Sequence, residues 1–302
     1  MTGILRGRKV AVLLGGPGSE REVSLRSGAA VARALQSLGA IVEEVDVKDS
    51  GFSLPSDVDL AYNMIHGTFG EDGQIQEILE RRGVPYTGEG IKGSHLAFDK
   101  ILSKTRFDEE GVPTGRWHVI TDGEFPRLDP PFVVKAPRQG SSVGVHIIKD
   151  VASLPAALED CFRFGEEVLV EEFFPGRELT IGILGDEALP IIEIVPREGF
   201  YDYEHKYTKG ASEYFVPAEI GGEATQAVQH AALSAKRALG LEVYSRVDVL
   251  LASDGRLNIL EINTIPGMTE TSLLPKAAAV AGLDFPALCE RIASLSLQRS
   301  PN

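Results

Sequence analysis

Residues 244–263 read YSRVDVLLASDGRLNILEIN, in which Asp254-Gly255 separates two runs of alternating apolar and polar side chains. Asp-Gly between such runs is a strong signal for a β-hairpin, because both central residues of the tightest turn need a positive φ. A two-residue turn at this dipeptide predicts that Asp248 lies directly opposite Glu261. Side chains alternate along a strand, so both carboxylates are predicted to project from one face of the hairpin.

The same face is predicted to carry Asn263 opposite Arg246, and this set of side chains indicates a metal site. Two carboxylates directly opposite each other repel and destabilise a sheet, whereas a divalent cation between them reverses that effect. Carboxylate and amide oxygens are also the ligands that Mg²⁺ takes in proteins. We therefore expect Asp248, Glu261 and Asn263 to hold metal. The alternative is a solvated sheet face whose charges are merely tolerated.

The chain has 302 residues, with 30 basic against 44 acidic side chains and a formal net charge of −14. This length predicts two or three domains. The acidic balance argues against a nucleic-acid or anionic-membrane partner, because such partners need Lys and Arg to neutralise phosphate. A nucleotide is not excluded, since a few basic groups can converge locally.

The cysteines and the N-terminus indicate a cytoplasmic protein. Cys161 and Cys289 lie far apart and lack metal-ligand spacing, as expected for buried thiols in a reducing compartment. The apolar run Val10–Leu14 is too short for a signal peptide, and no stretch reaches membrane-spanning length.

Strand-length apolar runs alternate with helix-period segments through the first third of the chain, which predicts a parallel sheet in one α/β domain ending near residue 95. Later segments change to strand, glycine loop and strand. The expected strands are Val10–Leu14, Ile41–Val47, Leu60–Ile65, Phe132–Lys135, Val145–Ile148, Val168–Glu172, Leu179–Leu184 and Leu189–Val195, followed by the hairpin. The expected helices are Val23–Leu38, Gln74–Arg82, Val151–Phe162 and Ala224–Leu239, with further helices at the C-terminus.

The loop Gly140–Gly144 (GSSVG) joins two of these strands and indicates a phosphate contact. Its glycines let the backbone approach a ligand, and Ser141 and Ser142 add hydroxyl donors. Lys135, on the preceding strand, is placed to meet phosphate charge. The pentapeptide also matches the serine-hydrolase elbow, but that motif needs a helix after the turn, and strand-forming residues follow here. No P-loop is present, and Gly15–Gly18 lacks the third glycine of a dinucleotide fingerprint.

The segment Pro196–Gly222 is polar, aromatic and glycine-containing, and it predicts a long loop. Loops of that length inside compact domains are mostly functional or disordered.

Taken together, these segments resemble the D-alanine–D-alanine ligases of the ATP-grasp superfamily, and the resemblance covers nearly the whole chain. Its specificity comes from the number, order and spacing of the matching pieces. They are Leu13–Ser24, His66–Gly73, Asp99-Lys100, Gly140–Gly144, Tyr201–Tyr207, Arg246–Asp248 and Glu261–Leu273.

The resemblance implies an α/β, three-domain ATP-grasp architecture with an N-terminal Rossmann-like parallel sheet. The expected units are residues 1–95, residues 96–182 and residues 183–302, with ATP between the last two and substrate where the first meets the last. It implies a cytoplasmic enzyme that makes D-alanyl-D-alanine for peptidoglycan through a D-alanyl phosphate. A homodimer is also implied, although nothing in the sequence indicates an interface.

The resemblance assigns roles to individual positions for ATP and metal. The nucleotide-binding residues would be Lys100, Lys135, Ser141, Ser142, Glu171, Phe173, Phe174, Glu178 and Lys206. Among them Glu171, Phe173 and Phe174 would line the adenine pocket, and Glu178 would bind ribose. The Pro196–Gly222 loop would be a lid that excludes water from ATP and the acyl phosphate, and Lys206 would reach the γ-phosphate when it closes. Asp248, Glu261 and Asn263 would hold two Mg²⁺ ions, with Mn²⁺ as a substitute.

The implied substrate contacts are equally specific. Glu20 would receive the ammonium of the first D-alanine, and His66 would lie near its carboxylate. The residues implied for the remaining steps are Arg246 and the Gly267 amide at the oxyanion, Ser272 and the Leu273 amide at the second carboxylate, and Tyr207 in a hydrogen-bonded set with Glu20 and Ser141.

Tyr207 carries a finer expectation. In this family a tyrosine at the end of the Tyr-x-x-x-Lys-Tyr stretch goes with dipeptide formation, whereas relatives that make the D-alanyl-D-lactate ester have other residues there. We therefore expect D-alanine as the second substrate.

Two alternatives stay open from the residues alone. Another ATP-grasp ligase would share the nucleotide and metal half but differ at Glu20, His66 or Ser272. A non-enzymatic nucleotide-binding protein on the same fold would have lost at least one residue of the metal and phosphate sites. All five of those residues are present: Asp248, Glu261, Asn263, Lys135 and Arg246.

Overall fold

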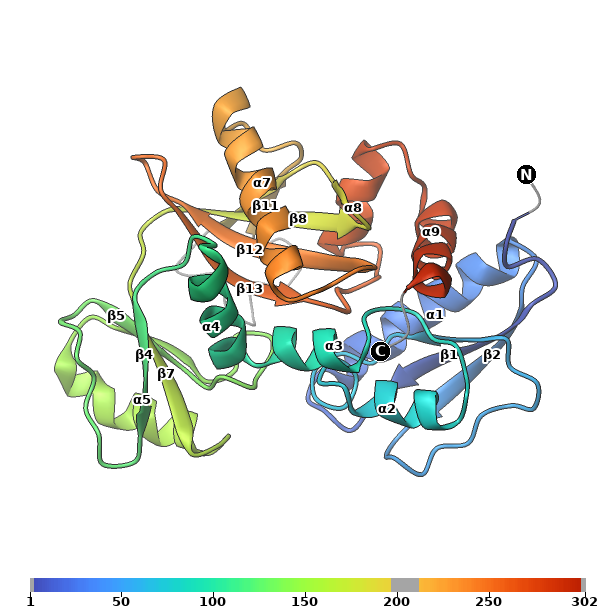
Figure 1. Ribbon diagram of the computed structural model, residues 1–302, viewed down its shortest axis with the longest axis horizontal. Coiled ribbons are helices and arrows are strands. Elements are labelled where there is room, and N and C mark those ends of the chain that lie inside the picture. The colour runs from blue at the N-terminus through green and yellow to red at the C-terminus, as the bar shows by residue number, and fades with distance from the viewer. Residues whose placement is uncertain (1–2, 197–211, 300–302) are drawn as a thin grey trace.

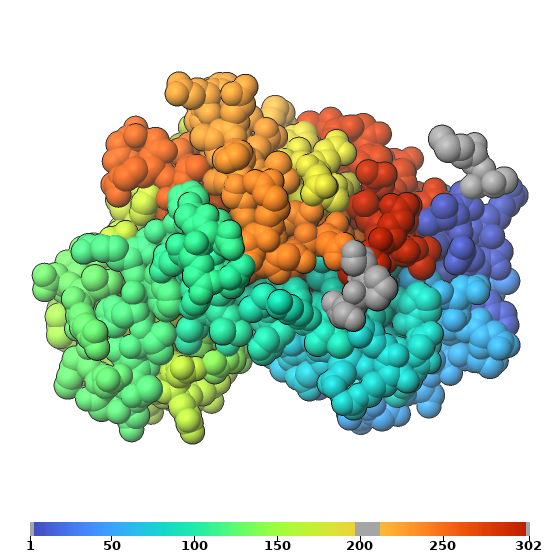
Figure 2. Space-filling view, viewed as in Figure 1, coloured from blue at the N-terminus to red at the C-terminus, as the bar shows by residue number. Residues whose placement is uncertain are grey.

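The computed structural model describes residues 3–196 and 212–299, and it contains three β-sheets with helices packed around them (Figure 1). The N-terminal sheet lies at one end of the molecule and the central sheet at the other. The C-terminal part lies across both (Figure 2). The α/β fold class is confirmed.

The N-terminal sheet is parallel, as predicted, with the strand order β2-β1-β3. Its central strand β1 is an almost wholly buried apolar run, which is typical of a strand covered on both faces. The elements of this part are β1 (Lys9–Gly15), α1 (Arg21–Ser37), β2 (Ile41–Val47), β3 (Leu60–Asn63) and α2 (Gln74–Arg81). Because β1 and β3 end at the same edge, the loops after them bring residues 16–20 and 64–73 together.

The central sheet is antiparallel, in the order β4-β7-β5-β6. Its elements are β4 (Trp117–Thr121), β5 (Phe132–Lys135), β6 (Val145–Ile148), a 3₁₀ turn η1 (Val151–Ser153), α5 (Leu154–Phe162) and β7 (Glu167–Glu172). Helix α5 packs on one face through Leu154, Ala157 and Cys161. The other face is left for the pocket described below.

The C-terminal sheet has the order β11-β10-β8-β12-β13, with β9 paired to β8. Its strands are β8 (Arg177–Leu184), β9 (Glu187–Ala188), β10 (Ile192–Pro196), β11 (Ser212–Phe215), β12 (Tyr244–Leu251) and β13 (Leu257–Asn263). Helices α3 (Ile91–Phe98), α4 (Lys100–Glu110) and α7 (Gly222–Ala238) share one core with this sheet. Strand β11 corrects part of one expectation, because residues 212–215 of the predicted long loop pair with β10.

The hairpin β12–β13 differs from the prediction in its turn. Ala252 and Arg256 are hydrogen-bonded across a loop of three residues, and Gly255 alone adopts a positive φ, +86°. This matches a three-residue hairpin that ends in a left-handed glycine. A register shift after Asp248 then compensates, so Asp248 still pairs with Glu261 as predicted. The predicted turn is wrong, and the predicted pairing is right because a β-bulge restores the register.

The last two helices, α8 (Leu273–Val280) and α9 (Phe285–Gln298), do not form a core of their own. Leu288 and Ile292 of α9 belong to the same buried cluster as Val10 and Leu14 of β1. The first and last thirds of the chain are therefore packed together. Within residues 3–196 and 212–299, no helix has the length and apolar character needed to cross a bilayer.

Candidate active site

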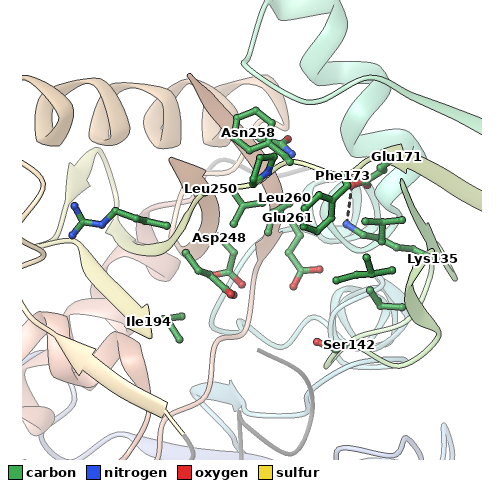
Figure 3. Close-up of a pocket in the computed structure, with 18 of the residues that line it drawn as sticks. Lys135, Ser142, Glu171, Phe173, Ile194, Asp248, Leu250, Asn258, Leu260 and Glu261 are labelled. Carbon is green, nitrogen blue, oxygen red and sulfur yellow. Dashed lines mark hydrogen bonds and ion pairs between the residues drawn. The ribbon is translucent and has the colours of Figure 1, made fainter. Parts of the chain in front are cut away.

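A deep pocket lies between the central and C-terminal sheets (Figure 3). One part is apolar and the other is charged. The apolar part includes Val133, Ile147, Phe173, Phe174, Ile194, Leu250 and Leu260, and the charged part includes Lys100, Lys135, Glu171, Glu178, Asp248 and Glu261.

The apolar part comes from both sheets. Phe173 and Phe174 follow β7, and Leu250 and Leu260 come from the hairpin. Leu260 is the residue that the bulge leaves without a cross-strand partner, since Asp248 pairs with Glu261 and the next residue, Val249, pairs with Ile259. The resulting slot of aliphatic and aromatic side chains is suited to a planar, apolar ring system.

The charged part of the wall is built from ion pairs. Lys135 Nζ donates to Glu171 Oε2 at 2.8 Å, and Glu171 is almost fully buried. Burial disfavours the carboxylate, but the positive charges of Lys104 and Lys135 outweigh that effect and lower the pKa of Glu171. Lys100 Nζ donates to the Gln139 carbonyl at 2.8 Å, beside the Gly140–Gly144 loop.

Asp248 is held by side chains from three strands, β8, β12 and β13. Arg246 contacts both of its oxygens, with Nε 3.0 Å from Oδ1 and Nη2 2.8 Å from Oδ2. Thr180, directly opposite on β8, donates its hydroxyl to Oδ1 at 2.6 Å. Asn263 Nδ2 lies 3.4 Å from Oδ2. All of these side chains share the sheet face opposite α7.

Glu261, across the hairpin from Asp248, has a basic partner of its own. Its Oε2 lies 3.1 Å from Lys100 Nζ. The repulsion expected from the sequence is therefore offset by Arg246 and Lys100, and it does not by itself require a cation. Figure 3 shows Asp248 and Glu261 pointing into the same space.

The donor set around that space fits Mg²⁺ better than a softer metal. Among the described residues, no group of three or more His, Cys, Asp and Glu side chains could enclose an ion. Two carboxylates and an amide make up the cluster here. Mg²⁺ is commonly held by one or two carboxylates while phosphate oxygens and water complete its shell, so this sparse set suits a metal that arrives with a phosphate ligand.

Two residues of the Gly140–Gly144 loop have strained backbone conformations, which set the direction of their side chains. Ser141 and Ser142 have φ values of +51° and +62°, in the left-handed region that non-glycine residues seldom occupy. The Ser141 hydroxyl donates to Glu20 Oε1, which links this loop to the N-terminal domain. A side chain at Gly140 would meet Glu20, because an ideal Cβ there lies 2.8 Å from Oε2.

A second pocket begins on the other side of this loop, where the first and last parts of the chain meet. It is smaller and more polar than the first. Its lining includes Glu20, Arg26, His66, Glu71, Ser141, Tyr214, Arg246, Asn263, Gly267, Ser272 and Leu273. The ion pair of Arg246 with Asp248 connects the two pockets, since Arg246 faces the second and Asp248 the first.

His66 holds the two sides of the second pocket together. Its Nδ1 lies 2.8 Å from the Ile265 carbonyl and its Nε2 3.2 Å from Ser27 Oγ, which accepts the Met268 amide at 3.2 Å. These partners assign the hydrogen to Nδ1. Burial disfavours the imidazolium, but the Glu71 carboxylate, whose Oε1 lies 3.7 Å from Nδ1, outweighs that effect and raises the pKa of His66.

The Ile265–Met268 loop, which His66 and Ser27 hold by hydrogen bonds, leads to the N-terminus of α8. Ser272 is the residue before the helix, and its Oγ accepts the Thr269 amide at 2.9 Å. Gly267 packs against it, because an ideal Cβ at Gly267 would lie 2.8 Å from Ser272 Oγ. Free amides at a helix N-terminus favour an anion.

The structure brings the sequence-predicted residues into one of the two pockets, with two exceptions. Lys206 and Tyr207 lie outside the described residues. Sequence reasoning assigned no role to Thr180, Glu71, Leu260 or Lys104. Glu71 lay inside a matching segment and Leu260 adjoins one, but Thr180 and Lys104 are connected to the site only through tertiary contacts, which no local pattern reveals.

Comparison with known proteins agrees with this geometry. The family profile of the D-ala D-ala ligase C-terminus matches residues 110–294, and that of the D-ala D-ala ligase N-terminus matches residues 40–89. A D-alanine–D-alanine ligase of Methylacidiphilum infernorum is 50% identical over 97% of this chain and 96% of its own length. One from Citrifermentans bemidjiense is 45% identical over 95% and 96%.

Solved structures show the same similarity in three dimensions. The D-alanine–D-alanine ligase of Bacillus anthracis complexed with ATP has a TM-score of 0.85 at 34% identity, covering 97% of this chain and 98% of its own. The VanG D-Ala:D-Ser ligase of Enterococcus faecalis also has a TM-score of 0.85, at 28% identity, covering 96% and 100%. The fold alone therefore does not separate acceptor specificities.

Proposed function

This chain belongs to the D-alanine–D-alanine ligase family, and on that premise we propose how its two pockets divide the reaction. The protein is an ATP-dependent ligase that forms the peptide bond of D-alanyl-D-alanine for peptidoglycan synthesis. The observation that carries the proposal is the Arg246–Asp248 ion pair. It joins the first pocket, which has an apolar slot and a charged part, to the smaller polar pocket.

ATP is proposed to lie in the pocket between the two sheets. The adenine would occupy the apolar slot beside Phe173 and Phe174, with Glu178 at the ribose. The phosphates would then extend toward Lys100, Lys135 and the Gly140–Gly144 loop. Convergent lysines and loop hydroxyls offset phosphate charge in such a site.

Asp248, Glu261 and Asn263 are proposed to hold Mg²⁺, with Mn²⁺ as a substitute. Their sparse oxygen set suits ions whose remaining ligands are phosphate oxygens. The ions would neutralise charge on the transferring phosphoryl group. Support comes from the chemistry of the donors and from their position between the two pockets.

The first D-alanine is proposed to bind with its ammonium at Glu20, which the Ser141 hydroxyl and two glycine-containing loops hold in place. Its carboxylate would attack the γ-phosphorus of ATP, the bond to the β,γ-bridging oxygen would break, and ADP and an acyl phosphate would result. His66 has both ring nitrogens engaged with protein atoms, so we assign it the positioning of the Ile265–Met268 loop as well as proximity to substrate.

The second D-alanine is proposed to bind with its carboxylate at Ser272 and the Leu273 amide. Its amine would attack the acyl phosphate, and Arg246 with the Gly267 amide would stabilise the oxyanion before phosphate leaves. Lys206 and Tyr207 keep their expected roles, at the γ-phosphate and beside Glu20 and Ser141, as predictions. D-alanine as the acceptor rests in part on Tyr207.

The domain division, the location and the oligomeric state are also proposals. Strand β8 pairs with β12 from Arg177 onward, so we place the boundary between the central and C-terminal domains before that residue and not after residue 182. A reaction that uses ATP supports a cytoplasmic enzyme. The homodimer is an expectation that sedimentation of the purified chain tests.

The order of chemical steps is tested with D-alanine labelled with ¹⁸O in its carboxylate. An acyl phosphate intermediate transfers one labelled oxygen to the released phosphate, which mass spectrometry detects. Unlabelled phosphate formed together with dipeptide would exclude the intermediate. The same reaction offered D-serine or D-lactate as acceptor measures the specificity that the fold leaves open.

A further inference from the structure

A lysine behind the nucleotide pocket, Lys104, has no role in the scheme above. It lies on α4 one turn after Lys100 and is 1% exposed, and it does not line the pocket. Its Nζ donates to Thr114 Oγ1 at 2.7 Å and lies 3.4 Å from Glu171 Oε1. Lys104 therefore touches the pocket only through Glu171.

Glu171 is shared between two cations. Lys135 holds Oε2 at 2.8 Å from the pocket side, and Lys104 approaches Oε1 from the protein interior. The three side chains carry two positive charges and one negative charge. The wall behind Lys135 consequently keeps one net positive charge, whereas Lys135 and Glu171 alone would form a neutral pair.

Burying a lysine in this position is costly for folding. Ionised groups lose hydration in the interior, and replacing a buried ion pair with apolar side chains is commonly neutral or stabilising. Burial lowers the pKa of the Lys104 ammonium despite the nearby Glu171. Lys104 is therefore a buried cation that does not favour folding. It contacts Glu171, which in turn contacts Lys135, a proposed phosphate ligand, and this position indicates a role in binding.

We propose that Lys104 is a positioning residue that neutralises Glu171 from behind, so that the Lys135 ammonium stays available to a nucleotide phosphate. The proposal rests on the proposed placement of ATP in this pocket. It predicts that phosphate affinity follows the net charge of the Lys104–Glu171–Lys135 group, while affinity for the uncharged nucleoside does not.

A purely structural role is the competing explanation. Thr114 also donates to the Ile259 carbonyl at 3.4 Å, so Lys104 could simply brace α4 against β13. A brace would alter stability, and its removal would loosen the whole pocket. It would then weaken adenosine and ADP together, because both ligands use the adenine slot.

The test measures the dissociation constants of ADP and adenosine by calorimetry, in metal-free buffer, for the full chain. The variants are Lys104→Met, Glu171→Gln and the double variant. The Lys104–Glu171–Lys135 group has a net charge of +1 in the wild type, and it becomes 0, +2 and +1 in these three variants, in that order. Lys104→Met is expected to weaken ADP binding about tenfold while adenosine binding stays the same, as for loss of one charge-assisted contact. The ratio of the adenosine Kd to the ADP Kd should therefore fall by the same factor. The double variant is expected to recover the wild-type ratio.

Lys236→Met is the matched control, because Lys236 is also buried and pairs with Asp186 at 2.9 Å away from this pocket. Its ratio should equal that of the wild type. An unchanged ratio in Lys104→Met, or a ratio that the double variant fails to restore, would overturn the proposal for Lys104 alone. A wild type that binds ADP no more tightly than adenosine would overturn the placement of ATP as well.

Discussion

Asp248 lines the first pocket and is held by Arg246, which lines the second. Arg246 donates hydrogen bonds to both carboxylate oxygens of Asp248, and Thr180 donates to one of them. These bonds fix the Asp248 side chain before any ligand binds. Carboxylates held in this way need no reorganisation when charge moves, which is the condition for effective electrostatic catalysis.

Asp248→Asn is expected to lower kcat about 10²- to 10³-fold, the range seen when one preorganised electrostatic group is removed. Adenosine binding should stay within twofold, since the apolar slot is intact. Steady-state kinetics and calorimetry check both parts. Asp254→Asn, an exposed change on the same hairpin, is the control and should leave kcat unchanged. If the kcat of Asp248→Asn stayed within tenfold of the wild-type value, the proposed role of Asp248 in the reaction would be contradicted.

Lys104 also predicts a pH dependence of stability. Burial lowers its pKa in the folded state below the value of about 10.4 that it has in the unfolded chain. Between these two pKa values the unfolded chain binds more protons than the folded chain. The unfolding free energy is therefore fully retained above the unfolded pKa and decreases as pH falls toward the folded pKa. Relative to Lys104→Met, the wild type should gain unfolding free energy as pH rises from 7 toward 10. Urea titrations across that range would contradict this if the difference stayed constant.

At the scale of elements, the sequence predicted the hairpin more reliably than its turn. Alternation and Asp254-Gly255 located both strands, and the Asp248–Glu261 pairing is correct. The three-residue loop and the bulge at Leu260 each shift the register by one residue, and they cancel. Local patterns do not reveal such compensation, because a bulge is fixed by what packs on the sheet, here by Leu260 in the apolar slot.

Gly255→Ala tests this turn. Gly255 has a φ of +86° and nothing within 4 Å of an added Cβ, so the substitution introduces backbone strain without a clash. We expect a loss of about 1–2 kcal/mol in unfolding free energy, with kcat unchanged. Gly222→Ala, at an equally open site without a positive φ, should be neutral or slightly stabilising. Equal effects of the two changes would contradict the positive φ of Gly255.

Helices and strands with a clear period were predicted nearly to the residue, as for Ile41–Val47 and Phe132–Lys135. The candidate site was predictable where a matching segment covered it. Thr180 and Lys104 could not be found in this way, because their partners Asp248 and Glu171 are far along the chain and only the folded sheets bring them together.

The whole molecule is held together by contacts between its first and last parts. Buried residues of α9 share a core with β1, and His66 ties the N-terminal domain to the loop before α8. The second pocket exists only because these parts are packed together, so substrate binding and folding are linked.

The fragment of residues 1–95 is therefore expected not to fold alone. Without α8 and α9, apolar side chains of β1 and α1 would face water. Circular dichroism during heating should show no cooperative transition for the fragment. A sharp transition, with dispersed amide signals in its NMR spectrum, would show that the first domain has a sufficient core of its own.

The ligase assignment itself has the most direct test at this scale, because only the assembled chain has both pockets. Phosphate release from ATP and Mg²⁺ is measured with no amino acid, with L-alanine, with D-alanine, and with D-alanine plus D-lactate, and products are identified by mass. We predict phosphate release that depends on D-alanine and yields D-alanyl-D-alanine at neutral pH. ATP binding without D-alanine-dependent release, or the D-lactate ester as the main product, would contradict it.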